Sequence, residues 1–356
     1  MKVAVGVSGG VDSAVAAALL KERGFEVIGV HLYCYDEGPY CTAPEDRASA
    51  VRVAKHLGIP LLVWDFRKQY KERVIKYFFD EYKVGRTPNP DVVCNREIKF
   101  GLFMEKALRE LGVNYVATGH YARVKKDKDD FHLLRGVDES KDQSYFLWNL
   151  SSKQLGHILF PIGDYKKIEV RKMAEEFGLS NYSRKDSMGV CFIGPVPIAK
   201  FLRENLPSQP GTVVNSQGEI IGEHDGVWFF TEGQRHGFKL FKPPALPLYV
   251  VGKNLADNTL IVGRGEESKV QSFEVKKPHW VWEIEDKKEM WVLVRIRHLG
   301  ELMPATIRPI GRSTSQVVTL RNPVQGVAPG QSAVFYRREE LLGGGVISKT
   351  LTFDHL

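Results

Sequence analysis

Two groups of residues in this chain have the types and spacing to do chemistry. The first is a run rich in glycine and serine near the beginning of the chain: Gly6, Val7, Ser8, Gly9, Gly10, Val11, Asp12 and Ser13. Glycines let a backbone approach an anion closely, and the free N–H groups at the start of a helix carry partial positive charge. Because Ser8 and Ser13 add hydroxyl donors, the run predicts a phosphate-binding loop.

The second group is a pair of cysteines, Cys94 and Cys191, each within a motif-like loop. Cys94 is expected to come directly before a helix, where the N-terminal partial charge stabilises a thiolate. Cys34 and Cys41 are interpreted as small buried hydrophobic residues, and no C-x-x-C pair indicates a zinc site. One thiol can carry a persulfide and a second can resolve it by thiol–disulfide exchange, so the pair predicts sulfur transfer.

The spacing of the glycine-rich run limits the kind of phosphate that it binds. A Walker A loop needs a lysine before its last Ser or Thr, and a dinucleotide fingerprint needs G-x-G-x-x-G; neither is present. The letters S-G-G-V-D-S, residues 8–13, resemble the PP-loop of ATP pyrophosphatases. Those enzymes cleave ATP between its α and β phosphates and adenylate a substrate. The alternative is an ordinary Gly/Ser turn that opens an α/β domain.

The elements around this loop predict how it is held. Apolar β-branched residues at 3–5 predict a strand before the loop, and an apolar helical face predicts a helix at 14–23 after it. Further strands at 25–33 and 59–65 alternate with helices at 43–57 and 68–82, which is typical of a parallel sheet. Ligands of such sheets bind beyond the carboxyl ends of the strands, where the loop lies.

The rest of the chain is predicted to change from mixed helices and strands to mostly β structure. The prolines at 86–95 indicate a rigid loop, followed by a helix at 98–111, a strand at 115–118, a hairpin at 122–136 and a helix that begins near Lys141. Past residue 207, short alternating segments at 211–214, 226–230, 259–262, 291–297, 315–320 and 332–336 predict β structure. The predicted domains are 1–203 (catalytic), 204–270 (small, mostly β) and 271–356 (a terminal barrel or sandwich).

Composition sets broad limits on the function. The chain has 356 residues, 43% of them hydrophobic and 26% charged, which is ordinary for a soluble globular protein. No apolar run approaches the ~20 residues of a membrane span, and no cleavable signal is evident, so we expect a cytoplasmic protein with no membrane partner. The net charge of +7 is a weak indication of a polyanionic partner.

A longer set of motifs carries a family resemblance. They are, in order, S-G-G-V-D-S, T-P-N-P-D-V-V-C-N, T-G-H-Y, L-L-R-G-V-D, K-D-Q-S-Y-F-L, D-S-M-G-V-C-F-I-G and P-G-Q-S-A-V-F-Y. Together they resemble the tRNA-specific 2-thiouridylase family from residue 3 to about residue 347. Departures from the family pattern are Ala14 for a common serine, Leu32 for a frequent methionine, Glu232 for an apolar residue and Ile296 for a frequent tyrosine.

The resemblance implies a fold and a reaction. The fold is α/β: an N-terminal parallel-sheet domain of the adenine nucleotide alpha hydrolase type, a small β-rich central domain and a C-terminal β-barrel. The reaction is ATP-dependent thiolation at C2 of the wobble uridine, position 34, in the tRNAs for Lys, Glu and Gln. ATP and Mg²⁺ are implied, with a cysteine desulfurase or a sulfur-relay protein as sulfur donor, and the chain is expected to be a monomer.

The resemblance also implies roles for single residues. Cys191 carries the persulfide, and Cys94 is the second catalytic cysteine. The implied ATP-binding residues are Gly6 to Ser13, Leu32 and Gly119, and the residues implied to meet the target base are Asn89, Pro90 and Asp91. The residues implied to contact tRNA are His120, Lys141, Asp142, Gln143, Arg295, Ile296 and Gln331.

Several of these roles have competing interpretations from the residues themselves. Asp91 suits a general acid/base that exchanges a proton with uridine N3, but also an Asx cap of the Cys94 turn. His120 suits a tRNA contact or a strand-end histidine bonded to backbone. Lys141 suits a phosphate contact better than helix filler. Arg295 and Arg297, two apart in a predicted strand, are expected to share one face towards an anionic backbone.

Three rival functions stay open at this point. One is another PP-loop enzyme, an amidating synthetase, which needs no pair of thiols. The second is a catalytically silent tRNA-binding protein. The third keeps the thiolation but lets Cys94 and Cys191, with or without a third thiol, hold an iron–sulfur cluster in place of a persulfide.

Overall fold

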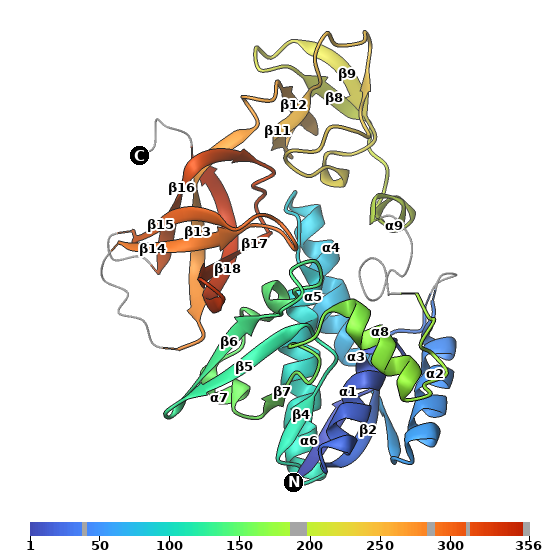
Figure 1. Ribbon diagram of the computed structural model, residues 1–356. Helices are drawn as coiled ribbons and strands as arrows, with labels where there is room; N and C mark the ends of the chain where they lie inside the picture. The colour runs from blue at the N-terminus through green and yellow to red at the C-terminus, as the bar shows by residue number, and fades with distance from the viewer. Residues whose placement is uncertain (38–40, 186–197, 283–288, 311–313, 352–356) are drawn as a thin grey trace.

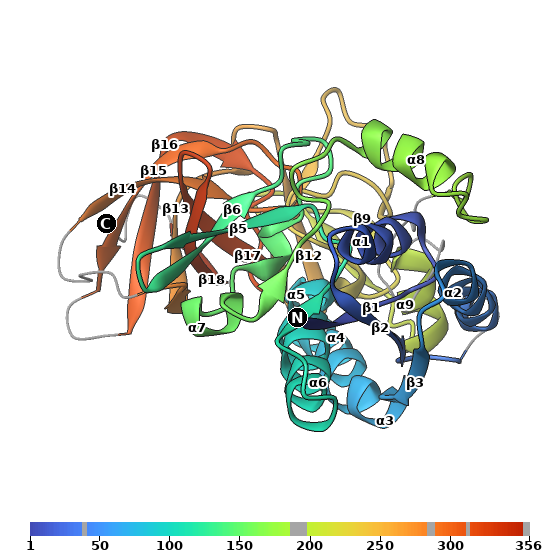
Figure 2. The ribbon, with the colours of Figure 1, turned by 60° about the horizontal axis from the view of Figure 1, so that its bottom comes forward.

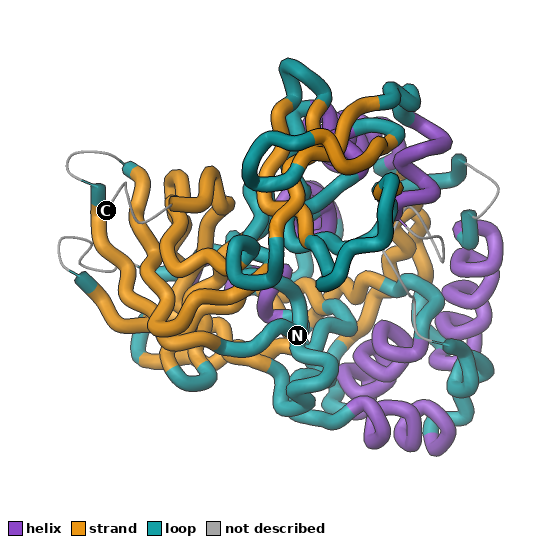
Figure 3. The backbone as a smooth tube through the Cα atoms, turned by 90° about the horizontal axis from the view of Figure 1, so that it is seen from above, coloured by secondary structure: helices purple, strands orange, loops and turns teal. Residues whose placement is uncertain are grey.

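Three β-sheets organise the computed structural model, which describes residues 1–37, 41–185, 198–282, 289–310 and 314–351. Figure 1 shows the first sheet with its helices at the lower right, the third sheet at the left and the second at the top. Seen from above in Figure 3, the helices gather on the side of the first sheet and the strands crowd on the side of the third.

The first sheet is fully parallel, in the order β3-β2-β1-β4-β7. Its strands are β1 (Lys2–Gly6), β2 (Glu26–Tyr33), β3 (Leu61–Asp65), β4 (Tyr115–Ala117) and β7 (Ile158–Leu159). The chain winds outwards from β1 to β3 and then returns to β4 on the other side of β1. The carboxyl end of β1 is therefore a topological switch point, where ligands of such sheets bind. This confirms the predicted parallel sheet.

Helices lie between these strands along the chain, and one more, α8, follows the last of them. They are α1 (Val11–Glu22), α2 (Ala43–Leu57), α3 (Arg67–Tyr70), α4 (Lys76–Lys83), α5 (Pro90–Cys94), α6 (Met104–Glu110), α7 (Ser152–Leu155) and α8 (Lys167–Glu176). Segments of π-helix, Lys71–Ile75 and Asn95–Phe103, join α3 to α4 and α5 to α6. The helix predicted at 68–82 is confirmed as one continuous helical stretch.

The helix that carries Cys94 begins earlier than the sequence predicts. It starts at Pro90, with Asn89 as its N-cap, and continues to Glu110. The prediction of a loop through residue 95 was wrong, because proline is well accommodated in the first turn, where its missing N–H has no partner in the helix. Cys94 therefore lies inside the helix, in its second turn, and not before it.

The predicted hairpin at 122–136 is confirmed as β5 (Ala122–Asp127) and β6 (Asp130–Arg135). It does not belong to the parallel sheet: β6 pairs with β18 of the third sheet, and Figure 2 shows the hairpin lying along that sheet. The helix predicted to begin near Lys141 was wrong. Lys141 lies in a turn, and a short 3₁₀-helix follows at Ser144–Leu147.

The second sheet has the order β10-β9-β8-β12-β11 and follows helix α9 (Ile198–Asn205). Its strands are β8 (Gly211–Val214), β9 (Ile220–His224), β10 (Lys239–Leu240), β11 (Tyr249–Asn254) and β12 (Thr259–Gly263). The strand predicted at 226–230 is instead a 3₁₀ turn, Val227–Phe229, which follows Gly226 at φ +148°. The central domain is thus mostly β, as predicted.

The third sheet closes into a barrel, because β18 pairs with both β17 and β13. Its strands are β13 (Lys269–Trp280), β14 (Met290–Arg295), β15 (Met303–Pro309), β16 (Ser315–Gln325), β17 (Ser332–Arg337) and β18 (Glu340–Leu351). Alternate residues such as Phe273, Val275 and Phe335 fill its interior. Of the two predicted alternatives, the barrel is confirmed. Among the described residues, no helix is long and apolar enough to cross a membrane.

Candidate active site

The carbonyl group of Gly9 anchors the glycine-rich loop to neighbouring segments of the chain. This oxygen accepts hydrogen bonds from Ser49 Oγ at 2.7 Å, Asn181 Nδ2 at 2.9 Å and Arg184 Nη1 at 3.2 Å. Gly9 has φ +86°, and a Cβ there would lie 2.3 Å from the carbonyl oxygen of Asp46. Glycine is therefore required at this position by both conformation and space.

The opposite side of the loop is arranged around two hydroxyls. Ser8 Oγ and Ser13 Oγ lie 3.1 Å apart, and the backbone N–H of Ser8 donates to Ser13 Oγ at 3.1 Å. Helix α1 begins after Gly10, which provides no side-chain cap, so within the described ranges the first-turn N–H groups are not capped by the N-cap side chain. Together with the switch point at β1, this arrangement suits an oligophosphate.

Asp12 stands in the first turn of α1 beside a buried cation. Lys167 Nζ at the start of α8 lies 2.6 Å from Asp12 Oδ1, and the Tyr121 hydroxyl donates to the same oxygen at 2.9 Å. Gly119, after β4, touches the loop so closely that a Cβ there would lie 2.6 Å from Ser13 N. The structure thus brings predicted Gly119 against the loop and adds Lys167 and Tyr121, which the sequence did not single out.

Local sequence patterns point to few of the residues that hold the loop. Lys167 follows another lysine in an ordinary amphipathic helix, 155 positions from Asp12. Asn181 and Arg184, which fix the Gly9 carbonyl, lie in an irregular stretch after α8. Only the T-G-H-Y motif, which contains Tyr121, gave a signal.

Cys94 is almost fully buried in the helix that starts at Pro90. Burial raises the pKa of its thiol to about 12, and the nearby charge of Lys99 only partly opposes this effect. Asp91, three positions earlier, and Cys34, just after β2, also raise this pKa, so both lie near the thiol. The predicted stabilisation of a Cys94 thiolate by a helix N-terminus was wrong, because the helix starts four residues earlier.

The other residues of the predicted site differ in their location and burial. Leu32 lies near the carboxyl end of β2, next to β1. Asn89 and Asp91 are half-buried and Pro90 is buried. Cys191 lies outside the described residues. Cys41 and Cys94 are free thiols, and within the described ranges no cluster of three His, Cys, Asp or Glu side chains could hold a metal.

Comparison with known proteins decides the family. The family model described as the tRNA methyl transferase HUP domain matches residues 1–195. The chain is 45% identical to a tRNA-specific 2-thiouridylase MnmA of Bacillus licheniformis over 97% of this chain and 94% of that protein. The chain belongs to the MnmA family. An MnmA of Bacillus subtilis is 44% identical, again over 97% of this chain and 94% of that protein.

The other two domains of this MnmA family member also match family models. Residues 199–264 match a model described as the tRNA methyl transferase PRC-barrel domain, and residues 270–347 match the aminomethyltransferase β-barrel domain. A solved 4-thiouridine synthetase in complex with RNA has 22% identity, with 52% of this chain and 42% of that chain covered and a TM-score of 0.35.

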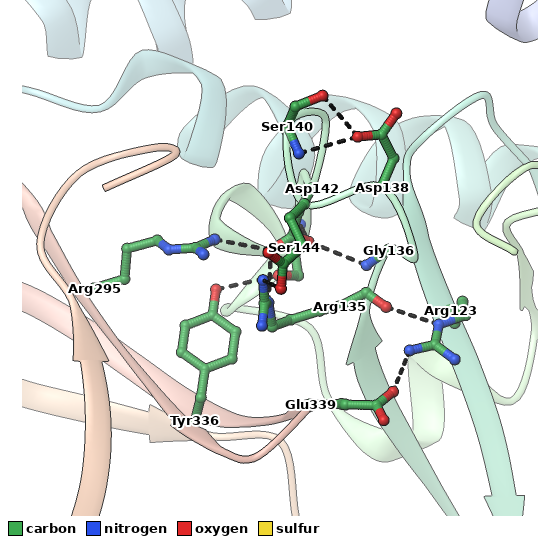
Figure 4. A network of polar contacts seen from close by, with 11 residues as sticks. Arg123, Arg135, Gly136, Asp138, Ser140, Asp142, Ser144, Arg295, Tyr336 and Glu339 are labelled. Atoms are coloured by element: carbon green, nitrogen blue, oxygen red, sulfur yellow. Dashed lines mark hydrogen bonds and ion pairs between the residues drawn. The ribbon is translucent and has the colours of Figure 1, made fainter. Parts of the chain in front are cut away.

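The residues for which the MnmA resemblance implied a tRNA contact are mostly covered by protein. Asp142 is fully buried and accepts from Gly136 N and Ser144 N, each at 3.1 Å, from Arg135 Nε at 3.3 Å and from Arg295 Nη1 at 2.8 Å (Figure 4). The buried pair of Asp142 and Arg295 joins the segment after β6 to the end of β14.

The remaining predicted contacts differ in exposure. His120 is buried; its Nδ1 lies 2.7 Å from Thr118 Oγ1, and burial together with the charge of Lys99 lowers its pKa well below the usual value. Ile296 is also buried, whereas Lys141, Gln143 and Gln331 are half-buried. The expectation that Arg295 and Arg297 share a face was wrong: β14 ends at Arg295, which is buried, and Arg297 beyond it is exposed.

Proposed function

We propose that this chain is a tRNA-uridine 2-sulfurtransferase that uses ATP to adenylate the C2 oxygen of the wobble uridine, position 34. The observation that carries the proposal is the PP-loop at the β1 switch point, with the Cys94 thiol near Cys34, which directly follows β2, the neighbour of β1. Membership of the MnmA family supports both the substrate class and the order of steps. The proposed ATP-binding residues are Gly6 to Ser13, Leu32 and Gly119.

The proposed reaction has two chemical stages, activation of the uridine and transfer of sulfur. Uridine O2 attacks the α phosphorus of ATP and pyrophosphate leaves. The Cys94 thiolate attacks Sγ of the Cys191 persulfide, and the released terminal sulfur bonds to C2 while AMP departs. The Cys94–Cys191 disulfide is then reduced by an external dithiol.

The charged residues near the loop are the groups proposed to assist these steps. Asp12 is the carboxylate on the loop and would lie nearest to a Mg²⁺ ion bound with the triphosphate; such an ion would supply charge neutralisation for the leaving pyrophosphate. Lys167 adds a cation on the same side. Asp91 is proposed to exchange the proton of uridine N3, with Asn89 and Pro90 beside the base.

The proposed partners follow from the family. The tRNAs for Lys, Glu and Gln are the proposed substrates, and a cysteine desulfurase or a sulfur-relay protein is the proposed sulfur donor. The chain is proposed to act as a monomer in the cytoplasm. Of the residues that the family resemblance assigns to tRNA contact, Lys141, Gln143 and Gln331 are half-buried. His120, Asp142, Arg295 and Ile296 are buried, so contact through them needs their main chain or a rearrangement on binding.

The test is nucleoside mass spectrometry of tRNA after reaction with ATP, a sulfur donor and single-cysteine variants. We expect 2-thiouridine with the unaltered chain and with Cys41→Ser, which serves as the matched control. Cys191→Ser and Cys94→Ser should give none, because each lacks one partner of the exchange. Full thiolation by Cys191→Ser would contradict the persulfide step.

The same reaction separates the rival functions. A silent tRNA-binding protein releases no pyrophosphate when tRNA is added to ATP. An amidating enzyme releases pyrophosphate and incorporates ammonia independently of both cysteines. An iron–sulfur enzyme loses thiolation on removal of iron and shows iron after anaerobic purification.

A further inference from the structure

The short segment that leads into the Cys94 helix is held by the central domain. Lys253 Nζ donates to the carbonyl oxygen of Gly85 and also to that of Phe230, the latter at 3.0 Å. Thr231 Oγ1 lies 2.9 Å from Thr87 Oγ1. Burial lowers the pKa of Lys253, and the nearby carboxylate of Glu232 opposes that shift. Glu232, which departs from the family pattern, thus supports the lysine that reaches Gly85.

The C-terminal barrel holds the same segment from another side. The N–H of Thr87 donates to the carbonyl oxygen of Pro329 at 2.8 Å. Gln331 Nε2 donates to the carbonyl oxygens of Thr87 at 3.0 Å and of Pro88 at 3.3 Å. Gly330 has φ +94°, and a Cβ there would lie 2.7 Å from Thr87 O, so the two backbones meet without space for a side chain.

A buried tyrosine completes the contact. Asn89 Nδ2 donates to the Tyr145 hydroxyl at 2.9 Å, and this hydroxyl lies 3.0 Å from the carbonyl oxygen of Ser332. Tyr145 has no exposed surface, and its pKa is raised by burial, so the hydroxyl keeps its proton for Ser332. Asn89, the N-cap of the Cys94 helix, is therefore tied through Tyr145 to the start of β17, one residue after Gln331.

We infer that Gln331 and Tyr145 are positioning residues, which fix residues 87–89 against the barrel and so place Asp91 and Cys94 for the reaction. This inference rests on the proposed function. It differs from the expected tRNA contact of Gln331, because the side-chain amide of Gln331 already donates to two backbone oxygens of the base-receiving segment. Gln331, beside β17 of the barrel, and Tyr145, in the 3₁₀-helix Ser144–Leu147, then control the thiol without touching substrate.

The chain offers a matched pair of substitutions. Gln331→Met keeps the length of the side chain and removes its donors. Gln325→Met is the control, since Gln325 lies in the same barrel and its Nε2 also donates to two acceptors, Gly265 O at 3.0 Å and Ser268 Oγ at 2.8 Å. Neither acceptor belongs to the segment at 85–89.

Two measurements decide between the roles. Amide hydrogen exchange of Thr87 reports on the contact between residues 87–89 and the barrel and does not depend on enzyme activity. Steady-state thiolation of tRNA separates effects on kcat from effects on KM. In Gln331→Met we expect Thr87 exchange to be about tenfold faster, and kcat about tenfold lower with KM for tRNA within about twofold, from the loss of one or two hydrogen bonds. Gln325→Met should change none of these.

The opposite pattern would overturn the inference. Gln331→Met with unchanged Thr87 exchange and a raised KM for tRNA would show a tRNA contact instead. Tyr145→Phe is a second test variant, and it should also accelerate Thr87 exchange and lower kcat. A thiolation rate equal to that of the unaltered chain would show that Tyr145 is not a positioning residue. If the unaltered chain forms no 2-thiouridine, the proposed function fails, whereas an unchanged Thr87 exchange rate in Gln331→Met defeats this inference alone.

Discussion

The Cys94 thiol is buried in the second turn of a helix, and burial raises its pKa to about 12. The thiolate is the nucleophile, so without tRNA this cysteine should react slowly with iodoacetamide. Its thiolate fraction, and hence its alkylation rate, should rise about tenfold for each pH unit between pH 7 and 9, because both values lie below the pKa. Peptide mass spectrometry measures this rate, with half-exposed Cys34 and Cys41 in the same sample as internal references.

A rate for Cys94 at neutral pH equal to that of the references would contradict the burial argument. An increase in the Cys94 rate on addition of tRNA, at constant pH, would indicate that substrate binding exposes the thiol or brings it closer to a cation. Lys99 is a candidate cation, since its charge already lowers the pKa of Cys94.

Lys167 is the second residue whose role can be isolated. Its Nζ lies 2.6 Å from Asp12 Oδ1, in the first turn after the phosphate loop. If this cation stabilises charge on the leaving pyrophosphate, Lys167→Met should lower tRNA-dependent pyrophosphate release by roughly a hundredfold. Lys172→Met is the control, because Lys172 lies on the same helix, is exposed and pairs with Glu176. Equal losses in both variants would indicate damage to α8 and not a role at the loop.

At the scale of elements, the pair of Asp142 and Arg295 joins the segment after β6 to the barrel. Both side chains are buried, and Nη1 of the arginine lies 2.8 Å from Oδ2 of the aspartate. Asp142→Asn should lower the free energy of unfolding by about 3–5 kcal/mol, because it leaves a buried guanidinium without its counter-charge. Urea denaturation measures the change.

The matched control for that change is Glu139→Gln. Glu139 pairs with Arg135 at 3.2 Å, but its side chain is 81% exposed. Such a surface pair contributes about 0–1 kcal/mol. A loss from Asp142→Asn as small as that from Glu139→Gln would show that water reaches the buried pair.

What the sequence could predict at this scale depended on local signals. The first parallel sheet followed from alternating strands and helices, and the phosphate loop from Gly9, Gly10 and their serines. The helix start at Pro90 was missed because a proline pair is equally compatible with a loop. Both interpretations satisfy the local rules, and only burial of Val92 and Val93 in the core favours the helix.

Contacts between distant segments had no local signal at all. Arg295 reads as an exposed strand residue, yet its partner Asp142 lies 153 positions away. The pairing of the β5–β6 hairpin with the barrel depends in the same way on β18, near the end of the chain. The predicted domain boundaries at 203 and 270 remain a proposal. The hairpin belongs to the predicted first domain by sequence but pairs with a strand of the predicted third domain.

At the scale of the whole molecule, one hydrophobic core passes through all three sheets. It contains Phe78 of α4, Phe230 of the central domain and Tyr336 of the barrel. The β6–β18 pairing and the contacts of Thr87 with Pro329 and Thr231 connect the same parts through hydrogen bonds. None of the three parts can open fully without exposing apolar surface of its neighbours.

We therefore expect the chain to unfold in a single cooperative transition. In scanning calorimetry the ratio of calorimetric to van't Hoff enthalpy should be about one, and near-ultraviolet and far-ultraviolet dichroism should follow the same curve. Independent domains would instead give a ratio well above one and separated transitions. The variant Asp142→Asn sharpens the test: if the barrel and the first domain are coupled as the shared core indicates, the substitution lowers the temperature of the whole transition, whereas splitting of the curve into two would show that this pair was the main connection.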